Sequence, residues 1–467
     1  MQTSSRESIE YYVRNGYWGE ESLESLFRRT VAIHPGRVAL ADPPDKETFT
    51  EGKPCRLTYS DLFTAVRDVS ARLLSAGLKK DQVVVSQLPN TVETVVLYLA
   101  LARIGALVCP VPVEKSCASL TGLALQLEPV MYVGCRYQHR DFLKQARTWL
   151  PESCQLASFS ETGDDEVLNL SFETHAGEEE IKHLGKIMDS VPVSPNEVFT
   201  LAWKRDEEGA RPAIPRTHNQ WFALASFVYE GAGLRNGDTL FCGFSLAAAS
   251  GIGAFLYNWL MAGARLVLDQ TGDTEQVISL ISQERVTCAG VPPAVLAQIK
   301  SYLEANDSHN LGCLRTLVSG FASIDSQLAD DVARLSGVNV LNCYGTSEGA
   351  SLLAVPADRC ERWSGQLFPR FCEQVEGWGS RMSRMVSTRL VDPGKGEEIT
   401  APEQPGELYV KGPSLFDGYY QPPGTAEDDD DDDDGFQRTG DLFVIDEDNP
   451  RFYRFIGRMN LQTESEA

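Results

Sequence analysis

Apolar positions in the first part of the chain follow a helical period. Between residues 60 and 76 they lie three or four residues apart, at Leu62, Val66, Val69, Leu73 and Leu74. This spacing predicts a helix with one face packed on a sheet. We expect Ser60 or Asp61 to cap its start and Gly77 to end it, after a short strand that begins near Arg56.

Strand-like and helix-like segments then alternate. β-Branched residues predict a buried strand at 82–88, helical spacing follows at 91–104 up to Gly105, and another strand is expected at 106–111. Later strands are expected at 239–244, 264–268, 286–291, 316–319 and 338–343. This alternation is typical of an α/β fold with a largely parallel sheet. The polar, acidic stretch 161–186 is expected to be a surface excursion.

From Gly406 the pattern changes to short strands and turns, which indicates a small β-rich subdomain. The predicted fold class is therefore α/β, with two α/β subdomains and a small β-barrel-like subdomain. We expect the first subdomain at 1–197, the second at 198–355, and the β-rich one at 356–467.

Composition and charge exclude some functions. With 42% hydrophobic and 23% charged residues, the chain is typical of soluble globular proteins. A net charge of −24 argues against a nucleic-acid surface, which needs clustered Lys and Arg. Glu427 and the seven aspartates at 428–434 form an acidic run that predicts a solvated loop, with a metal site as the alternative.

Eleven cysteines occur without a C-x-x-C pair, which favours reduced thiols over a disulfide framework or a structural zinc site. The N-terminus lacks the apolar core of a signal peptide. The longest apolar stretch, 95–113, contains Arg103, Pro110 and Pro112, so we do not expect it to span a membrane. The expected location is the cytoplasm.

Three segments near the C-terminal end are similar to known sequence motifs. They read GELYVKGP at 406–413, GYY at 418–420 and GFQRTGDL at 435–442. In order and spacing they resemble the core motifs of the adenylate-forming (ANL) superfamily, which includes acyl-CoA synthetases, luciferases and nonribosomal-peptide adenylation domains. The resemblance implies that Asp441 accepts hydrogen bonds from both ribose hydroxyls, a task suited to a carboxylate. The alternative is a carboxylate that caps its own loop.

The segment NCYGTSEG at 342–349 resembles the YGxTE motif of the same superfamily. The resemblance implies that Tyr344 stacks near adenine, Thr346 binds the α-phosphate and Glu348 helps to hold Mg²⁺. Gly345 lets the backbone approach the ligand. Thr346 and Glu348 are thus the predicted catalytic residues. The alternative is an ordinary turn after a strand.

Two further matches extend the predicted nucleotide site. Gly320, Phe321 and Ala322 match the strand that flanks adenine, which usually reads Gly-Gly-Ala or Gly-Ala-Ala. Phe321 therefore departs from the family pattern. Arg458 matches an arginine near the ribose.

The N-terminal half resembles aryl-acid ligases of the 2,3-dihydroxybenzoate or salicylate type, which serve siderophore assembly. This resemblance rests on YVRNGYW at 12–18 and IPRTHN at 214–219, and it implies an acid pocket that contains His218 and Gly320. The family's His-Asn pair for the ring hydroxyl falls on Ala247 and Ala248, which favours a more apolar acid.

The phosphate loop departs most from the family pattern. A Ser/Thr/Gly-rich stretch that ends in Pro-Lys is replaced by KRDEEGARP at 204–212. Glu207 and Glu208 occupy the hydroxyl positions, and Pro212 occupies the lysine position. At about 4 Å and a dielectric near 20, each carboxylate repels a phosphate charge by about 4 kcal/mol. The use of ATP and Mg²⁺ is in doubt for this reason.

The family continues past Gly457-Arg458 into a hinge and a C-terminal lid with a catalytic lysine. Here the sequence given ends at Ala467, so the lid is expected to be absent and no lid lysine is assigned. Residues 371–388 are additional to the family pattern, as a true insertion or an unspliced gene segment.

Two functions follow from these matches. The first is a ligase of secondary metabolism that converts an aryl or apolar carboxylic acid and ATP into an acyl adenylate, for transfer to coenzyme A or a carrier-protein thiol. The alternative is a catalytically impaired or truncated homologue that acts as a binding or partner protein.

Overall fold

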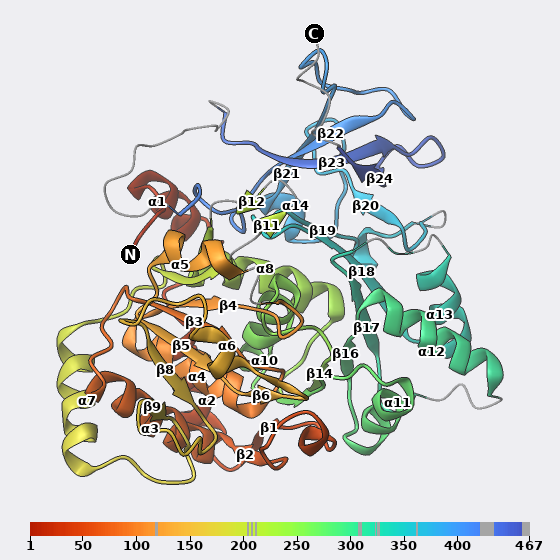
Figure 1. The fold of residues 1–467 in the computed structure, drawn as a ribbon. Helices are drawn as coiled ribbons and strands as arrows, with labels where there is room; N and C mark the ends of the chain where they lie inside the picture. The colour runs from red at the N-terminus through yellow and green to blue at the C-terminus, as the bar shows by residue number, and fades with distance from the viewer. Residues whose placement is uncertain are drawn as a thin grey trace. The chain divides into compact units, whose positions relative to one another are not determined.

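The structure is a computed structural model that describes residues 1–116, 120–202, 205–206, 209–210, 213–306, 311–322, 324, 327–360, 363–420 and 434–459. The chain forms two compact units (Figure 1). Of the described residues, unit 1 contains those within 1–222, 235–272 and 416–420, and unit 2 contains those within 223–234, 273–415 and 434–459. The subdomain boundaries predicted at 197 and 355 stay predictions.

A seven-stranded sheet forms the centre of unit 1. Its strands, in spatial order, are β13 (Ile214–Thr217), β10 (Val198–Ala202), β4 (Leu107–Pro110), β3 (Val83–Gln87), β5 (Met131–Gly134), β8 (Gln155–Ser158) and β9 (Val167–Asn169). All neighbours run parallel except β13, which pairs antiparallel with β10. The predicted strands at 82–88 and 106–111 are β3 and β4.

A second group of strands in unit 1 joins distant parts of the chain. Parallel pairs link β14 (Thr239–Cys242) to β15 (Arg265–Leu268) and β15 to β1 (Val38–Ala41), and β1 pairs antiparallel with β2 (Arg56–Thr58). The helical segments of this unit are α1 (Arg6–Arg14), α2 (Leu23–Ile33), a 3-10 turn (Lys46–Thr48), α3 (Tyr59–Ser75), α4 (Val92–Ile104), α5 (Thr121–Leu127), α6 (Phe142–Ala146), α7 (Glu178–Ser190), α9 (Ala249–Gly251), a π-helical turn (Ile252–Leu256) and α10 (Tyr257–Met261).

The predicted helix at 60–76 is α3, but its cap is neither Ser60 nor Asp61. Thr58 is the N-cap and accepts a hydrogen bond from the Asp61 amide, while the Asp61 carboxylate accepts one from the Thr58 amide. This reciprocal capping box places the N-cap two or three residues earlier than expected. Gly77 follows the helix with a φ of +93°, a left-handed conformation that favours glycine, as expected of its stop.

Most residues of the stretch 161–186 are exposed or half-buried, as expected of a surface excursion, but the stretch also forms regular structure. It contains β9, which extends the sheet, and the start of α7, which packs against α3. Arg72 of α3 donates hydrogen bonds to the carbonyl oxygens of Ser171 and Thr174. Strand pairing and these contacts thus give regular structure to a stretch of polar composition.

Unit 2 contains a mainly parallel group of strands and an antiparallel sheet. The first group consists of β16 (Cys288–Gly290), β17 (Thr316–Gly320), β18 (Asn339–Gly345) and the antiparallel β19 (Ser351–Leu353). The antiparallel sheet has the order β20 (Leu367–Pro369), β24 (Phe452–Arg458), β23 (Gln437–Ile445), β22 (Gly406–Lys411) and β21 (Ser387–Val391). Its helices are α11 (Thr274–Gln283), α12 (Pro293–Ala305), α13 (Leu328–Ser336) and α14 (Met382–Met385).

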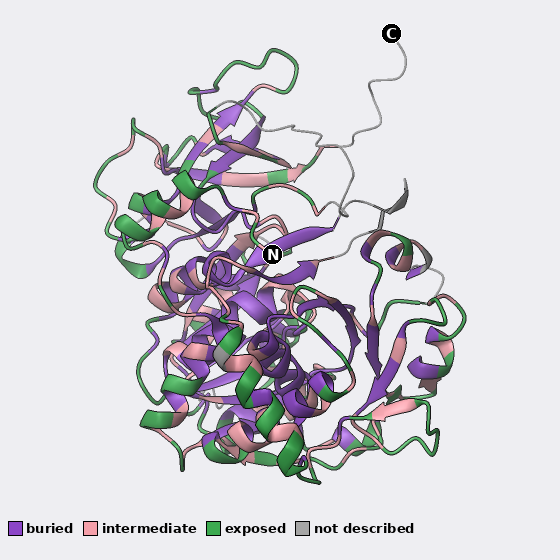
Figure 2. Cartoon of the chain, turned by 90° about the vertical axis from the view of Figure 1, so that its left-hand side faces the viewer, coloured by how far each residue is buried: buried purple, intermediate pink, exposed green. Residues whose placement is uncertain are grey.

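Strands and helices both carry many of the buried residues, and the outward turns of many helices are exposed (Figure 2). The additional residues 371–388 take part in the packing of unit 2. Trp378 packs edge-on against Phe371 and Phe452, with ring centroids 5.2 and 5.4 Å apart, and Met382 is fully buried. The segment thus contributes to the core beside β24.

The predicted phosphate loop lies mainly outside the described residues. Glu207, Glu208 and Pro212 are among those not described. Of the described residues in this stretch, β11 (Arg205–Asp206) pairs antiparallel with β12 (Gly209–Ala210). The remaining helix, α8 (His218–Ala232), begins in unit 1, and its residues from Ala223 onward belong to unit 2.

Candidate active site

A cavity of about 250 Å³ in unit 2 contains most of the predicted nucleotide residues. Three chain segments supply them: the residues after β17, the end of β18, and the paired strands β23 and β24. The predicted residues that line the cavity are Phe321, Ala322, Tyr344, Gly345, Asp441 and Arg458. The fold therefore brings together motifs that are more than a hundred residues apart in the sequence.

The parallel pairing of β17 and β18 fixes one side of the cavity. Gly320 lies opposite Cys343 in this pairing and has a φ of +112°. A Cβ atom at Gly320 would lie 2.2 Å from the Cys343 carbonyl oxygen, so only glycine fits there. The amide of Phe321 donates a hydrogen bond to the same oxygen at 2.6 Å. Gly320 thus supports the cavity wall through its backbone.

Asp441 is the central polar group of the cavity. It is only 5% exposed, and its Oδ2 accepts a hydrogen bond from the Tyr344 hydroxyl at 2.7 Å. Arg458 lies opposite it on β24, with Nη1 3.6 Å from Oδ1. Burial, together with the neighbouring Asp441 carboxylate, raises the pKa of Tyr344 well above its usual value. Tyr344 therefore stays protonated and holds the carboxylate in place.

The two predicted catalytic residues follow directly after β18 but do not line the cavity. Thr346 and Glu348 are partly exposed and belong to a turn in which the Thr346 amide donates to the Ala350 carbonyl at 2.9 Å. In the same turn, a Cβ atom at Gly349 would lie 2.0 Å from the Ser414 carbonyl oxygen. Close packing of Gly349 against Ser414, the residue after the GELYVKGP motif, therefore fixes this turn beside Tyr344.

The predicted acid-pocket residues of unit 1 lie in two different environments. His218 is buried, with its Nδ1 2.9 Å from the Tyr257 hydroxyl and its ring stacked on Phe199 at 5.0 Å. Burial lowers the pKa of His218 to about 3. Ala247 and Ala248 are partly exposed in the turn before α9. His218 is thus a neutral packing residue in this structure, and its role in a pocket stays a prediction.

His218 gives a pH-dependent prediction. Because its folded pKa of about 3 lies below the usual 6.5, the unfolded chain binds the extra proton, and stability falls as the pH drops below 6.5. Between pH 6.5 and 5 this costs about 2 kcal/mol. His218→Gln should reduce the difference in urea midpoint between pH 7 and pH 5, and an unchanged difference would contradict the assignment.

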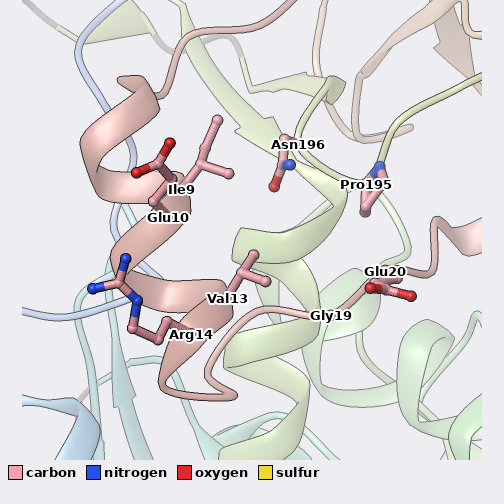
Figure 3. A pocket seen from close by; sticks show the side chains of 8 residues that line it. All are labelled: Ile9, Glu10, Val13, Arg14, Gly19, Glu20, Pro195 and Asn196. Carbon is pink, nitrogen blue, oxygen red and sulfur yellow. The ribbon is translucent and has the colours of Figure 1, made fainter.

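A second hollow, of about 490 Å³, lies in unit 1 beside α1 (Figure 3). Ile9, Val13 and Pro195 give it apolar walls, and Glu10 and Arg14 lie at its side. It adjoins the YVRNGYW motif at 12–18. Its lining includes no predicted site residue.

Comparison with known proteins identifies the family. The profile of the AMP-binding enzymes matches residues 27–420. The chain belongs to this family. The pyochelin synthase PchD of Pseudomonas aeruginosa is 26% identical over 452 residues, which cover 94% of this chain and 75% of that protein. The 4-coumarate-CoA ligase 1 of Narcissus pseudonarcissus is 23% identical and covers 85% and 70% of the two chains, respectively.

Solved structures of other proteins have the same fold as this chain. The apo structure of MbtA from Mycobacterium smegmatis has a TM-score of 0.75 at 22% identity and covers 98% of this chain and 80% of that one. ATP-bound MatB from Rhodopseudomonas palustris has a TM-score of 0.70 at 20% identity and covers 94% and 79%. The predicted α/β fold, the membership of the adenylate-forming superfamily and the prediction of an enzyme are confirmed.

Membrane spans, metal-binding clusters and disulfides were sought in the described part of the chain. Within it, no helix is long and apolar enough to cross a membrane, and no cluster of three or more His, Cys, Asp or Glu side chains is arranged to bind a metal ion. None of the described cysteines is joined in a disulfide bond.

Sequence reasoning missed several residues that line the cavity, namely Ile324, Asn342, Gln366, Phe368 and Phe455. Asn342 stands at the start of a recognised motif, and its Nδ2 donates to the Gly365 carbonyl at 2.8 Å. Gln366 and Phe368 have no motif to mark them. They reach the cavity because β20 pairs with β24, a contact between segments far apart in the sequence.

Proposed function

We propose that this AMP-binding family member converts a carboxylic acid and ATP into an acyl adenylate and pyrophosphate, and then transfers the acyl group to a thiol of coenzyme A or a carrier protein. The observation that carries the proposal is the cavity in which Asp441, held by Tyr344, lies with Phe321, Ala322 and Gly345. Its size and mixture of aromatic and acidic side chains suit the adenosine part of a nucleotide.

In this proposal Asp441 accepts hydrogen bonds from the ribose hydroxyls. Arg458 faces the same carboxylate and adds positive charge beside the sugar and phosphate. Thr346 binds the α-phosphate from the turn after β18. A carboxylate oxygen of the acid attacks the α-phosphorus, the bond to the bridging oxygen breaks, and pyrophosphate leaves. The thiol then attacks the acyl carbonyl, and AMP leaves with the electron pair of the bond that breaks.

Glu348 is the residue that would hold Mg²⁺. The ion keeps several waters and is commonly bound by one or two carboxylates together with substrate phosphates. A single carboxylate in the turn beside the cavity fits this requirement. Bound there, Mg²⁺ would neutralise part of the phosphate charge.

The acid is proposed to be aryl or apolar. An aryl acid is suggested by the name of one relative, 4-coumarate-CoA ligase 1, and by the resemblance of residues 12–18 and 214–219 to aryl-acid ligases. Ala247 and Ala248 offer no hydrogen-bonding side chain for a ring hydroxyl, so an acid without one is favoured.

Binding and turnover test the proposal separately. Titration calorimetry with AMP should show one site, and a panel of benzoic, cinnamic and medium-chain acids with Mg-ATP should release pyrophosphate. No AMP binding would contradict the proposal as a whole. AMP binding without acid-dependent pyrophosphate release would favour a homologue that binds nucleotide without turnover, which Glu207 and Glu208 at the hydroxyl positions of the phosphate loop also favour.

The phosphate-loop residues give a prediction of their own. The triple variant Glu207→Thr, Glu208→Thr, Pro212→Lys should bind ATP at least about tenfold more tightly, since carboxylates that repel the β- and γ-phosphates are removed and a cation is added. AMP lacks those phosphates, so its affinity should stay the same. Calorimetry with both nucleotides provides the control, and equal gains for AMP and ATP would show that the loop does not act on the terminal phosphates.

A further inference from the structure

The turn at 363–367 contributes a wall of the unit 2 cavity that no sequence motif marks. Gln366 lies in this turn and Phe368 directly follows it, and both line the cavity. The Leu367 amide donates a hydrogen bond to the Ser364 carbonyl at 3.0 Å, which closes the turn. The position of the turn therefore decides the shape of this wall.

Helix α13 holds the turn from outside the cavity. Asp330, in the first turn of α13, accepts a hydrogen bond from the Gly365 amide through Oδ1 at 3.0 Å. A Cβ atom at Gly365 would lie 2.6 Å from the Cβ of Ala329, so a larger residue would push the turn away from the helix. Glycine at 365 thus allows the close approach that the hydrogen bond needs.

The same glycine also reaches β18. Its carbonyl accepts a hydrogen bond from Nδ2 of Asn342 at 2.8 Å. Asn342 is only 8% exposed and lines the cavity, and its Oδ1 would lie 2.7 Å from a Cβ atom at Gly320. The carboxamide therefore has little freedom to turn. A chain of hydrogen bonds thus runs from Asp330 through Gly365 to Asn342.

We propose that Asp330 is a positioning residue for the nucleotide site, because through Gly365 it fixes Asn342 and Gln366 in the cavity wall. The inference rests on the proposed function and deepens it at the same site. Asp330 does not itself line the cavity. A hydrogen bond to a carboxylate is stronger than one between neutral groups, so it holds the turn in place before the ligand binds. A wall that is already ordered lowers the cost of binding.

A purely structural role of Asp330 is the alternative to be separated from positioning. A carboxylate in the first turn of a helix stabilises the helix through its dipole. Asp331 lies in the same first turn, and its carboxylate pairs with Lys300 and Arg334, each at 2.9 Å. It shares the effect on the helix, whereas Asp330 bonds the cavity wall. Asp331 is therefore the matched control.

The test measures AMP affinity by titration calorimetry in the full chain and in the variants Asp330→Ala, Asp330→Asn and Asp331→Ala. Asp330→Ala should weaken AMP binding by about fivefold, because one hydrogen bond that orders the wall is lost. Asp330→Asn keeps an oxygen that can accept from the Gly365 amide, so it should retain most of the affinity. Asp331→Ala should leave AMP affinity unchanged, although urea unfolding should show that it destabilises the chain.

Unchanged AMP affinity in Asp330→Ala would overturn the proposal. So would equal losses in Asp330→Ala and Asp331→Ala, which indicate a general effect of the helix, or a loss in Asp330→Asn as large as in Asp330→Ala. If Asp330→Ala does not fold, hydrogen exchange on the unaltered chain decides. Because coupling between the turn and the ligand is reciprocal, AMP should slow amide exchange in a peptide that contains 363–367, and unchanged exchange would contradict the proposal.

The same measurements separate this inference from the proposed function. An unaltered chain that binds no AMP overturns the proposed function. AMP binding that is insensitive to Asp330→Ala overturns only the positioning role of Asp330.

Discussion

Asp441→Asn is expected to weaken AMP binding by about a hundredfold, since hydrogen bonds to a charged group contribute about 1.5–3 kcal/mol each and two ribose hydroxyls are involved. An amide offers one carbonyl oxygen in place of two carboxylate oxygens, and its NH₂ group would face the Tyr344 hydroxyl or the Arg458 guanidinium. Calorimetry with AMP measures the effect without involving the phosphate loop.

Two variants serve as controls for Asp441→Asn. Tyr344→Phe removes only the hydroxyl that holds the carboxylate, so it should weaken AMP binding by a smaller factor, about fivefold. Asp434→Asn removes an exposed carboxylate that pairs with Arg389 near the start of β23 and does not line the cavity, so AMP affinity should not change. If Asp434→Asn and Asp441→Asn reduced affinity alike, the effect would reflect net charge and Asp441 would not be the ribose contact.

Lys46→Met is expected to lower the free energy of unfolding by about 3–5 kcal/mol, the cost of leaving buried charges without their partner. Lys46 is 1% exposed, and its Nζ lies 2.7 Å from a carboxylate oxygen of Asp42 and 2.7 Å from one of Glu93. Burial acts to lower the pKa of Lys46, but the two carboxylates outweigh it and raise the pKa above its usual value. The lysine therefore stays charged.

The Lys46 cluster joins several elements of unit 1. Asp42, which follows β1, accepts hydrogen bonds from the amides of Val92, at the start of α4, and Cys55, before β2. Loss of the lysine would leave two carboxylates close together at this junction. Urea unfolding measures the change, and the triple variant Lys46→Met, Asp42→Asn, Glu93→Gln should regain much of the loss because no buried charge remains.

Lys80→Met is the matched control for Lys46→Met. Lys80 also belongs to unit 1 and pairs with Glu197 at 2.6 Å, but its side chain is 23% exposed. Water reaches Lys80 more than Lys46, so Lys80→Met should lower the free energy of unfolding by clearly less than Lys46→Met does. Equal effects of the two substitutions would show that burial of the Lys46 cluster is not the source of its stability.

Sequence patterns predicted a helix or strand correctly where the whole pattern lies within that one element. The helix at 91–104 is α4, which ends at Gly105 in a left-handed conformation as the glycine predicted. The sequence pattern gave the wrong residue where an interaction between two residues sets the boundary. Thr58 caps α3 instead of Ser60 or Asp61, because the side chains of Thr58 and Asp61 each accept a hydrogen bond from the backbone amide of the other residue. The stretch 161–186 was expected as a surface excursion, and its polarity gave no sign that β9 would pair with β8.

The candidate site shows the same division. The sequence identified Tyr344 and Asp441 through motifs that resemble a known superfamily, but it gave no sign that the hydroxyl of one bonds the carboxylate of the other at 2.7 Å. It marked Phe321 as a departure without revealing its positive φ or its contact with Gly345. Gln366 and Phe368, which no motif marks, entered the cavity through strand pairing.

The sequence by itself determined the class of fold, the family and the residue types available for nucleotide chemistry, because these depend on local periodicity and on short motifs with fixed spacing. Only the tertiary structure decided which of those residues meet. The distance between Lys46 and Glu93, like that between Asp441 and Arg458, depends on how separate helices and strands pair and pack. Hydrophobic burial and backbone hydrogen bonds over the whole fold set that arrangement.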